Sequence, residues 1–146
     1  MLVRRREAFS LLELLFVILI IAIVAGLAIP SLLNSKKAGY EAATISYLRA
    51  LGSAQEVYRI QRDTFASDFK VLAELKLVQE PDSEALGYEL ELAVVGTGQS
   101  AWWAVANPVE PGRTGDRYFY LDGTGVIRES LDGPADESSN PLNAAD

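Results

Sequence analysis

Apolar residues are concentrated near the start of the chain. Residues 14–29 form an unbroken apolar run, and within residues 9–29 the single charged side chain is that of Glu13. A helix rises about 1.5 Å per residue, so about 20 residues cover the roughly 30 Å of hydrocarbon in a bilayer. The pattern therefore predicts a membrane-spanning helix over residues 9–29.

Helical periodicity resumes directly after this run. Six residues recur at spacings of three or four, which is one face of an amphipathic helix: Tyr40, Ala43, Tyr47, Leu51, Ala54 and Tyr58. Charged residues of the segment, Glu41 among them, lie off that stripe. We predict one long helix from about Ser10 to Arg62, with the tyrosine stripe in the core. Pro30 should kink it because proline removes a backbone hydrogen bond, although Pro30 could instead end the membrane helix and begin a linker.

The rest of the chain changes from helical to strand-like patterns. A connecting region, 63–81, should contain a short helix over 67–77 with Ser67 or Asp68 as its N-cap. Four strands are predicted after it, with turns at 96–99 and 122–125: residues 88–95, 101–106, 117–121 and 126–129. Trp102 and Trp103 alternate faces, so one should fill the core. The fold class is therefore α+β, a small antiparallel sheet with the helix across one face.

Composition narrows the function classes. The 146 residues suit one small domain plus one additional element, and the chain has no cysteine and no histidine. It therefore lacks disulfides, thiolate metal sites and the commonest general base, so we expect no catalytic site and no cofactor. The net charge is -7, and loss of residues 1–8, which carry +2, would leave -9. An acidic head disfavours nucleic acid as a partner.

Three ordinary explanations compete for the apolar segment. The arginines at 4–6 place its start on the cytoplasmic side, as in a cleaved secretory signal ending near Ala28 or in an uncleaved anchor. A buried helix of a soluble protein would need more polar interruption. None of the three explains Glu13, because a carboxylate inside a spanning helix costs about 2.5 to 3.5 kcal/mol. A cut between Ala8 and Phe9 would create an ammonium group one helical turn before Glu13, at a depth where the two could pair.

Residues 4–15, RRREAFSLLELL, resemble the cleavage and methylation motif of type IV prepilins and type II secretion pseudopilins. The shared features are a basic leader, a small residue before the cut, Phe9 after it, Glu13 four residues on, and Pro30 at the end of the apolar run. The family usually has glycine before the scissile bond, whereas this chain has Ala8, preceded by the unusual Glu7. Processing after alanine is therefore expected to be slower.

The resemblance implies a pilin-like fold and a structural, non-enzymatic subunit. It divides the chain into a leader (1–8), a transmembrane and filament-core helix (9–30), a head (31–130) and a flexible tail (131–146). A prepilin peptidase would remove the leader and N-methylate Phe9, and an inner-membrane assembly platform would polymerise the subunit into a homo-oligomeric filament. The precursor would cross the inner membrane once with its head in the periplasm, and the assembled pilus would be extracellular.

Other functions remain open from the sequence. Because major pseudopilins of type II secretion bind calcium in a C-terminal loop, we considered four acidic residues as ligands: Asp122, Asp132, Asp136 and Glu137. The spacing of these residues matches no calcium-binding loop, so we expect no metal. The lack of this loop favours a pilus over a secretion pseudopilus. A secreted or membrane-anchored binding module is the second class. Electron conduction along the aromatic residues is a third. The sequence does not separate adhesion, motility, DNA uptake and secretion.

Overall fold

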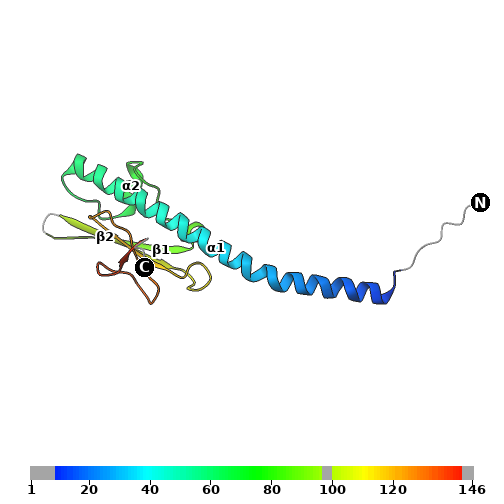
Figure 1. Cartoon of the computed structure of the whole chain (residues 1–146). Coiled ribbons are helices and arrows are strands. Elements are labelled where there is room, and N and C mark those ends of the chain that lie inside the picture. The colour runs from blue at the N-terminus through cyan, green and yellow to red at the C-terminus, as the bar shows by residue number, and fades with distance from the viewer. Residues whose placement is uncertain (1–8, 97–99, 143–146) are drawn as a thin grey trace, which may run out of the picture. The chain divides into compact units, whose positions relative to one another are not determined.

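The computed structural model describes residues 9–96 and 100–142, so the leader, the tip of the 96–99 turn and residues 143–146 lie outside the description. The described chain divides into two compact units, with the boundary between Ser35 and Lys36. The described part of the first unit is helical from Leu11 onward. The second contains the remaining helix, two short helices and a sheet (Figure 1).

Helix α1 spans Leu11–Arg62 and contributes to both units. The prediction of one helix over about Ser10 to Arg62 is confirmed. Within the second unit, α1 buries a stripe that includes Thr44, Leu48, Leu51 and Gln55. This stripe lies against the sheet because the sheet's inner face supplies the apolar partners.

The predicted position of the helix stripe is partly wrong. Ala43 is exposed, whereas Glu41, expected off the stripe, is buried. Tyr40, Tyr47 and Tyr58 are half-buried and pack at the border of the core. Tyrosine suits such a border because its ring is apolar and its hydroxyl needs a polar partner. For Tyr47 that partner is the carbonyl oxygen of Gln79, 2.6 Å away.

The connecting region contains two short helices, α2 (Phe69–Glu74) and α3 (Ser83–Leu86). The predicted N-cap of α2 is Asp68, whose carboxylate accepts from the amide of Lys70. This helix ends before the predicted residue 77 because Lys76 adopts a left-handed φ of 57°, and the Leu77 amide bonds back to the Leu72 carbonyl. Helix α3 was not predicted.

Five antiparallel strands form one sheet in the order β1-β2-β3-β4-β5. The strands are β1 (Tyr88–Val95), β2 (Ala101–Pro108), β3 (Tyr118–Asp122), β4 (Arg128–Ser130) and β5 (Asn140–Pro141). Four of them were predicted: β1 with the same bounds, and β2, β3 and β4 with bounds that differ by one or two residues. β5 and the 2.7 Å bond from the Leu142 amide to the Ile127 carbonyl tie part of segment 131–142 to the sheet. Flexibility of the tail as a whole stays a prediction.

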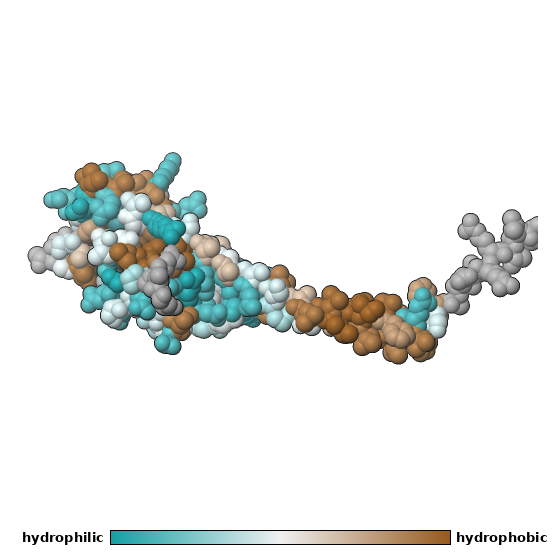
Figure 2. Space-filling view, viewed as in Figure 1, coloured by the Kyte–Doolittle hydropathy of each residue, from teal (hydrophilic) through white to brown (hydrophobic). Residues whose placement is uncertain are grey.

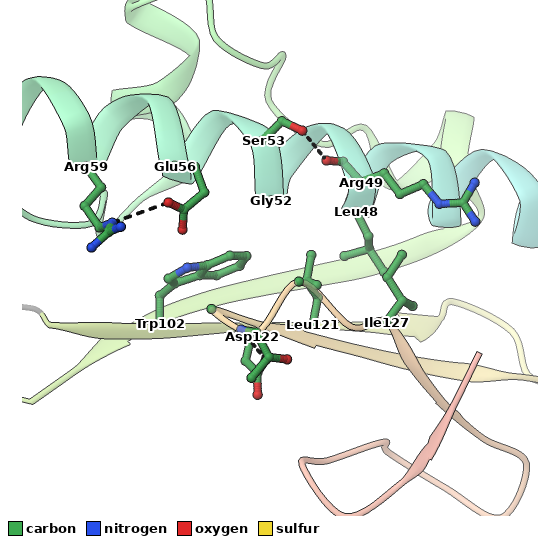
Figure 3. A pocket seen from close by; sticks show the side chains of 13 residues that line it. Leu48, Arg49, Gly52, Ser53, Glu56, Arg59, Trp102, Leu121, Asp122 and Ile127 are labelled. Carbon is green, nitrogen blue, oxygen red and sulfur yellow. Dashed lines mark hydrogen bonds and ion pairs between the residues drawn. The ribbon is translucent and has the colours of Figure 1, made fainter. Parts of the chain in front are cut away.

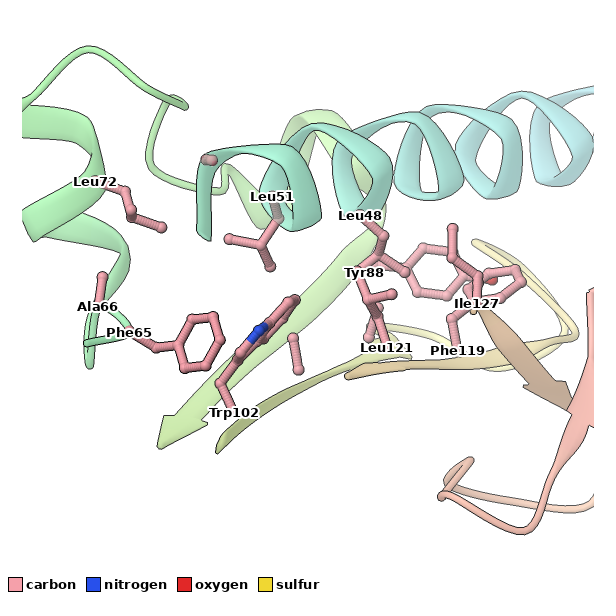
Figure 4. Packing of buried hydrophobic residues seen from close by; sticks show 13 residues of the cluster. Leu48, Leu51, Phe65, Ala66, Leu72, Tyr88, Trp102, Phe119, Leu121 and Ile127 are labelled. Atoms are coloured by element: carbon pink, nitrogen blue, oxygen red, sulfur yellow. The ribbon is translucent and has the colours of Figure 1, made fainter. Parts of the chain in front are cut away.

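Strict alternation along β2 and β3 separates an inner and an outer face of the sheet. Trp102 is 3% exposed and lies in the core, while Trp103 is half-buried on the other face, as the alternation predicts. Figure 4 shows how inward side chains of the sheet meet those of α1 and of the connecting region. The largest fully buried members are Tyr88, Phe119, Leu48, Leu51, Leu72 and Leu121.

Candidate assembly site

The apolar part of α1 has no cover within the first unit. Between residues 11 and 33 its large apolar side chains are 43–84% exposed, and Figure 2 shows them as a continuous brown band. α1 is the one helix in the described chain long and apolar enough to cross a membrane, and its most apolar window has no buried residue. Burying one such side chain is worth about 1.5 to 3 kcal/mol, so this surface requires lipid or other helices around it.

The helix begins at the residues that the sequence singled out. The hydroxyl of Ser10 accepts from the Leu12 amide at 3.3 Å, so the first turn starts directly after Phe9, which is 76% exposed. Glu13 lies in that first turn, where the helix dipole favours negative charge. Within residues 9–96 and 100–142, no cation pairs with its carboxylate. Ala8 and the proposed scissile bond lie outside the described residues.

Pro30 lies inside α1, which continues on both sides of it. The alternative in which the helix ends at Pro30 is therefore wrong. In the next turn the Ser35 hydroxyl donates a hydrogen bond to the Ser31 carbonyl oxygen at 3.0 Å. Serine hydroxyls inside helices commonly bond in this way to the carbonyl four residues earlier. The expected kink stays a prediction.

In the second unit, Glu41 holds α1 to the segment before β3. Its Oε1 accepts from the backbone amides of Asp116 and Arg117 at 2.9 and 3.3 Å. Its Oε2 accepts from Nε and Nη2 of Arg117 at 2.9 and 2.8 Å. Arg117 also reaches Glu129 on β4 at 2.6 Å, so one guanidinium joins the helix to two strands.

Charge and hydrogen bonding keep the Arg117 guanidinium of this cluster positive. Burial alone would lower the pKa of Arg117, but hydrogen bonds and charge from Glu129 and Glu41 outweigh it, so the pKa is raised and the guanidinium stays positive. One turn earlier, Lys37 pairs with Asp116 at 2.6 Å. The cluster of Glu41, Arg117 and Glu129 was missed in the sequence, because Glu41 was placed off the stripe.

Beside this cluster, the backbone at Gly115 passes close to the ring of Tyr88. The Tyr88 hydroxyl donates to the Arg117 carbonyl at 2.8 Å, and burial raises the pKa of Tyr88, so the phenol stays protonated. Gly115 passes directly over this ring: a Cβ there would lie 1.9 Å from the hydroxyl oxygen. Glycine is therefore required by space at position 115, although its φ is ordinary.

The acidic residues considered for calcium are not gathered into a site. Asp122 accepts from the amide and hydroxyl of Thr124. Asp136 accepts from Ser138 and Ser139, and these hydrogen bonds lower its pKa. Among the described residues no three acidic, histidine or cysteine side chains are placed to hold a metal ion.

Comparison with known proteins finds a family model for the start of the chain and relatives similar to more of it. Residues 3–29 match the family model of the prokaryotic N-terminal methylation motif. The chain is 37% identical over 78 residues to the type IV wide pilus major component PilA4 of Thermus thermophilus, a match covering 53% of this chain and 60% of that protein.

Two relatives extend the match into the head. The type II secretion system core protein G of Dickeya chrysanthemi is 28% identical over 112 residues, covering 77% of this chain and 73% of the relative. That of Klebsiella pneumoniae is 25% identical over 129 residues, covering 88% and 92%. The chain thus carries the prokaryotic N-terminal methylation motif and is similar in sequence to a type IV pilus component and to type II secretion core proteins.

Proposed function

We propose that the chain is a structural subunit of a type IV pilus-like filament, made as a prepilin. Residues 1–8 are a leader removed by cleavage between Ala8 and Phe9, and Phe9 is then N-methylated. Residues 9–30 form the membrane and filament-core helix, 31–130 the head, and 131–146 the tail.

The observation that carries this proposal is the uncovered apolar helix with a single carboxylate in its first turn. A membrane or a bundle of identical helices would bury the apolar surface. Glu13 would then need a cation at the same depth, and the amine of Phe9 on a neighbouring subunit supplies one. A buried charge without a partner is costly, whereas a matched pair is tolerated, so Glu13 acts as a register device.

The partners follow from this route. The subunit is a substrate of a prepilin peptidase, waits in the inner membrane with its head in the periplasm, and is polymerised by an assembly platform into an extracellular filament. The acidic head repels phosphate backbones, so it binds no nucleic acid in this proposal. The role is non-enzymatic, in keeping with relatives that are named as pilus and secretion-system components.

N-terminal sequencing and intact mass of the native protein test the processing. Material sheared from cells should begin at N-methylated Phe9 and contain 138 residues, that is, 146 without the leader of eight. A mature protein that starts near Ile29 would instead support a secreted binding module. An intact Met1 found only in membranes would support a membrane-anchored one.

Glu13 itself is tested by substitution. Glu13→Ala should still insert and be cleaved, because neither step needs the carboxylate, but sheared filament should be lost. Glu13→Asp keeps the charge and is the matched variant, so it should retain part of the filament yield. Normal polymerisation of Glu13→Ala would show that the pairing with Phe9 is wrong.

A subunit of a type II secretion pseudopilus is the second candidate. The observation that favours it is coverage, since the secretion relatives align with 73% and 92% of their own length and the pilus component with 60%. Deletion of the gene separates the two: loss of surface filaments with normal export of secreted enzymes supports the pilus, and the reverse supports the pseudopilus.

A further inference from the structure

A groove of about 840 Å³ lies between α1 and the turn that joins β3 to β4 (Figure 3). Polar side chains of the helix form one wall and the glycine-containing turn 122–125 forms the other. Its base is apolar, with Leu48, Leu121 and Ile127 pointing toward one another. Gly52 faces this base from α1 and has no side chain to fill the groove. A Cβ added at Gly52 would lie 3.6 Å from the Leu121 side chain, in ordinary contact with it.

The indole of Trp102 borders this groove and has an unused donor. Trp102 is 3% exposed, and within residues 9–96 and 100–142 its buried Nε1 has no hydrogen-bond acceptor. Gly123 passes close to the indole, since a Cβ at Gly123 would lie 3.7 Å from Nε1. A buried N–H without an acceptor is unfavourable, and an indole nitrogen can only donate. The groove therefore favours an occupant that brings an acceptor.

Charges on the rim point to the same kind of occupant. The carboxylate of Glu56 pairs with Arg59. The Asp122 carboxylate accepts from Thr124 through Oδ1 alone, and Figure 3 shows it pointing away from the helix. The Arg49 guanidinium has no ion-pair partner in the described part of the chain, and Figure 3 shows it extending away from Glu56. On the helix side of the groove the unmet groups are thus donors, and the complementary surface is acidic with an apolar side chain.

One segment of the same chain has this chemistry. Leu131 follows β4 and is 70% exposed, and the following residues include Asp132, Asp136 and Glu137 with no lysine or arginine up to Leu142. The other strongly exposed apolar residue of the head is Ile60, at 81%. Ile60 is a poorer candidate for the groove, because its sequence neighbours Arg59 and Arg62 would bring positive charge next to the positive Arg49.

We propose that the exposed start of segment 131–137, Leu131 and Asp132, occupies the groove of a second copy, while Ala135 stays buried in its own head. Leu131 lies on the apolar base, the Asp132 carboxylate pairs with Arg49, and an oxygen of the segment accepts from Trp102 Nε1. Groove and segment are different parts of one chain, so the contact closes on a dimer if it is reciprocal and repeats from copy to copy if it is heterologous. The filament of the proposed function requires the heterologous form. This proposal rests on the proposed function, because it names a contact between heads within the filament.

Cysteine pairs test the contact directly, since the chain has no cysteine of its own. Ser53→Cys on the helix wall and Leu131→Cys are combined in the full-length chain, and sheared filaments are treated with a short bismaleimide. We expect a ladder of covalent multimers. The matched control combines Ser53→Cys with Val109→Cys, which is 45% exposed and lies beside Gly87, near Tyr40 and about 20 Å along α1 from Ser53, beyond the reach of the linker within one subunit. This pair should give no ladder. Filaments with no ladder from the first pair, or with equal ladders from both, would overturn the proposal.

A charge exchange provides the second test. Arg49→Glu should reduce the yield of sheared filament, because it places two carboxylates together, and adding Asp132→Arg should restore it. A wild-type yield from Arg49→Glu, or no restoration in the double variant, argues against the contact. Filaments that assemble without this contact refute it and leave the proposed function standing. Failure of the unsubstituted chain to form any filament or pseudopilus removes both.

Discussion

Loss of the Glu41 carboxylate should destabilise the head far more than loss of an exposed one. In Glu41→Ala the backbone amides of Asp116 and Arg117 lose their acceptor, and the Arg117 guanidinium keeps only Glu129. The side chain of Glu41 is 10% exposed, so water replaces it poorly. The helix and the segment before β3 would then be held together by packing and by the Lys37–Asp116 pair.

The size of the effect follows from the burial of the two partners. Breaking a buried ion pair by removing one partner costs about 3 to 5 kcal/mol. The Arg117 side chain is 33% exposed and can recover part of its hydration. We therefore expect about 3 kcal/mol, the lower end of that range. For a head of this size that corresponds to a fall in Tm of about 10 °C.

Thermal unfolding of the full chain in detergent, followed by near-ultraviolet circular dichroism, measures this. The matched control is Glu110→Ala, because Glu110 also pairs with an arginine at 2.9 Å but with both side chains more than half exposed. Such surface pairs contribute at most about 1 kcal/mol, so the control should shift Tm by only a few degrees. Glu41→Gln should fall between the two, since its amide oxygen can still accept. Equal shifts for Glu41→Ala and Glu110→Ala would refute the reasoning.

Three further outcomes are expected. Burial, followed by the charge of Glu80, raises the pKa of Tyr47 to about 12, whereas unfolded tyrosine ionises near pH 10. The resulting stabilisation is complete below about pH 10 and is lost as pH rises toward 12, and ultraviolet titration should show one late-titrating phenol fewer in Tyr47→Phe than in the unsubstituted chain. Gly115→Ala should unfold the head or leave little of it folded at 37 °C, because the new methyl group would overlap Tyr88; a normal melting curve would contradict this. Gly39→Ala meets nothing within 4 Å in α1 and should stabilise it by about 1 kcal/mol, visible as a small rise in Tm.

The long elements were predictable because their patterns are strong. A sustained helical period and an unbroken apolar run placed α1 within one residue at its start, and alternation placed β1 and β2. The short elements were less predictable from the sequence. Helix α2 stops at a lysine in the left-handed conformation, where glycine would normally signal the end. Strand β5 has only two residues, Asn140–Pro141, and leaves almost no periodic trace.

The position of the stripe on α1 shows where pattern alone fails. Tyr40, Ala43, Tyr47 and Ala54 of the predicted stripe recur at helical spacing, but Glu41, Thr44, Leu48 and Gln55 recur just as regularly one position later. Apolar character favoured the tyrosines. The structure buries the second set because each polar member has a partner supplied by a distant segment. Gln55, for example, exchanges two 2.9 Å bonds with the backbone of Ala66. Such partners are invisible in a local pattern.

The two acidic residues that matter most on α1 differ in where their partners lie. Glu41 is buried and its two oxygens are fully used by the segment before β3, so its role is complete within one chain. Glu13 lies among exposed apolar side chains, and no described cation of its own chain pairs with it. A carboxylate in hydrocarbon costs about 2.5 to 3.5 kcal/mol, which the isolated helix does not offset. In the proposed function this compensation comes from the Phe9 amine of another subunit, so the Glu13 partner is sought at a subunit contact and the Glu41 partner inside the fold.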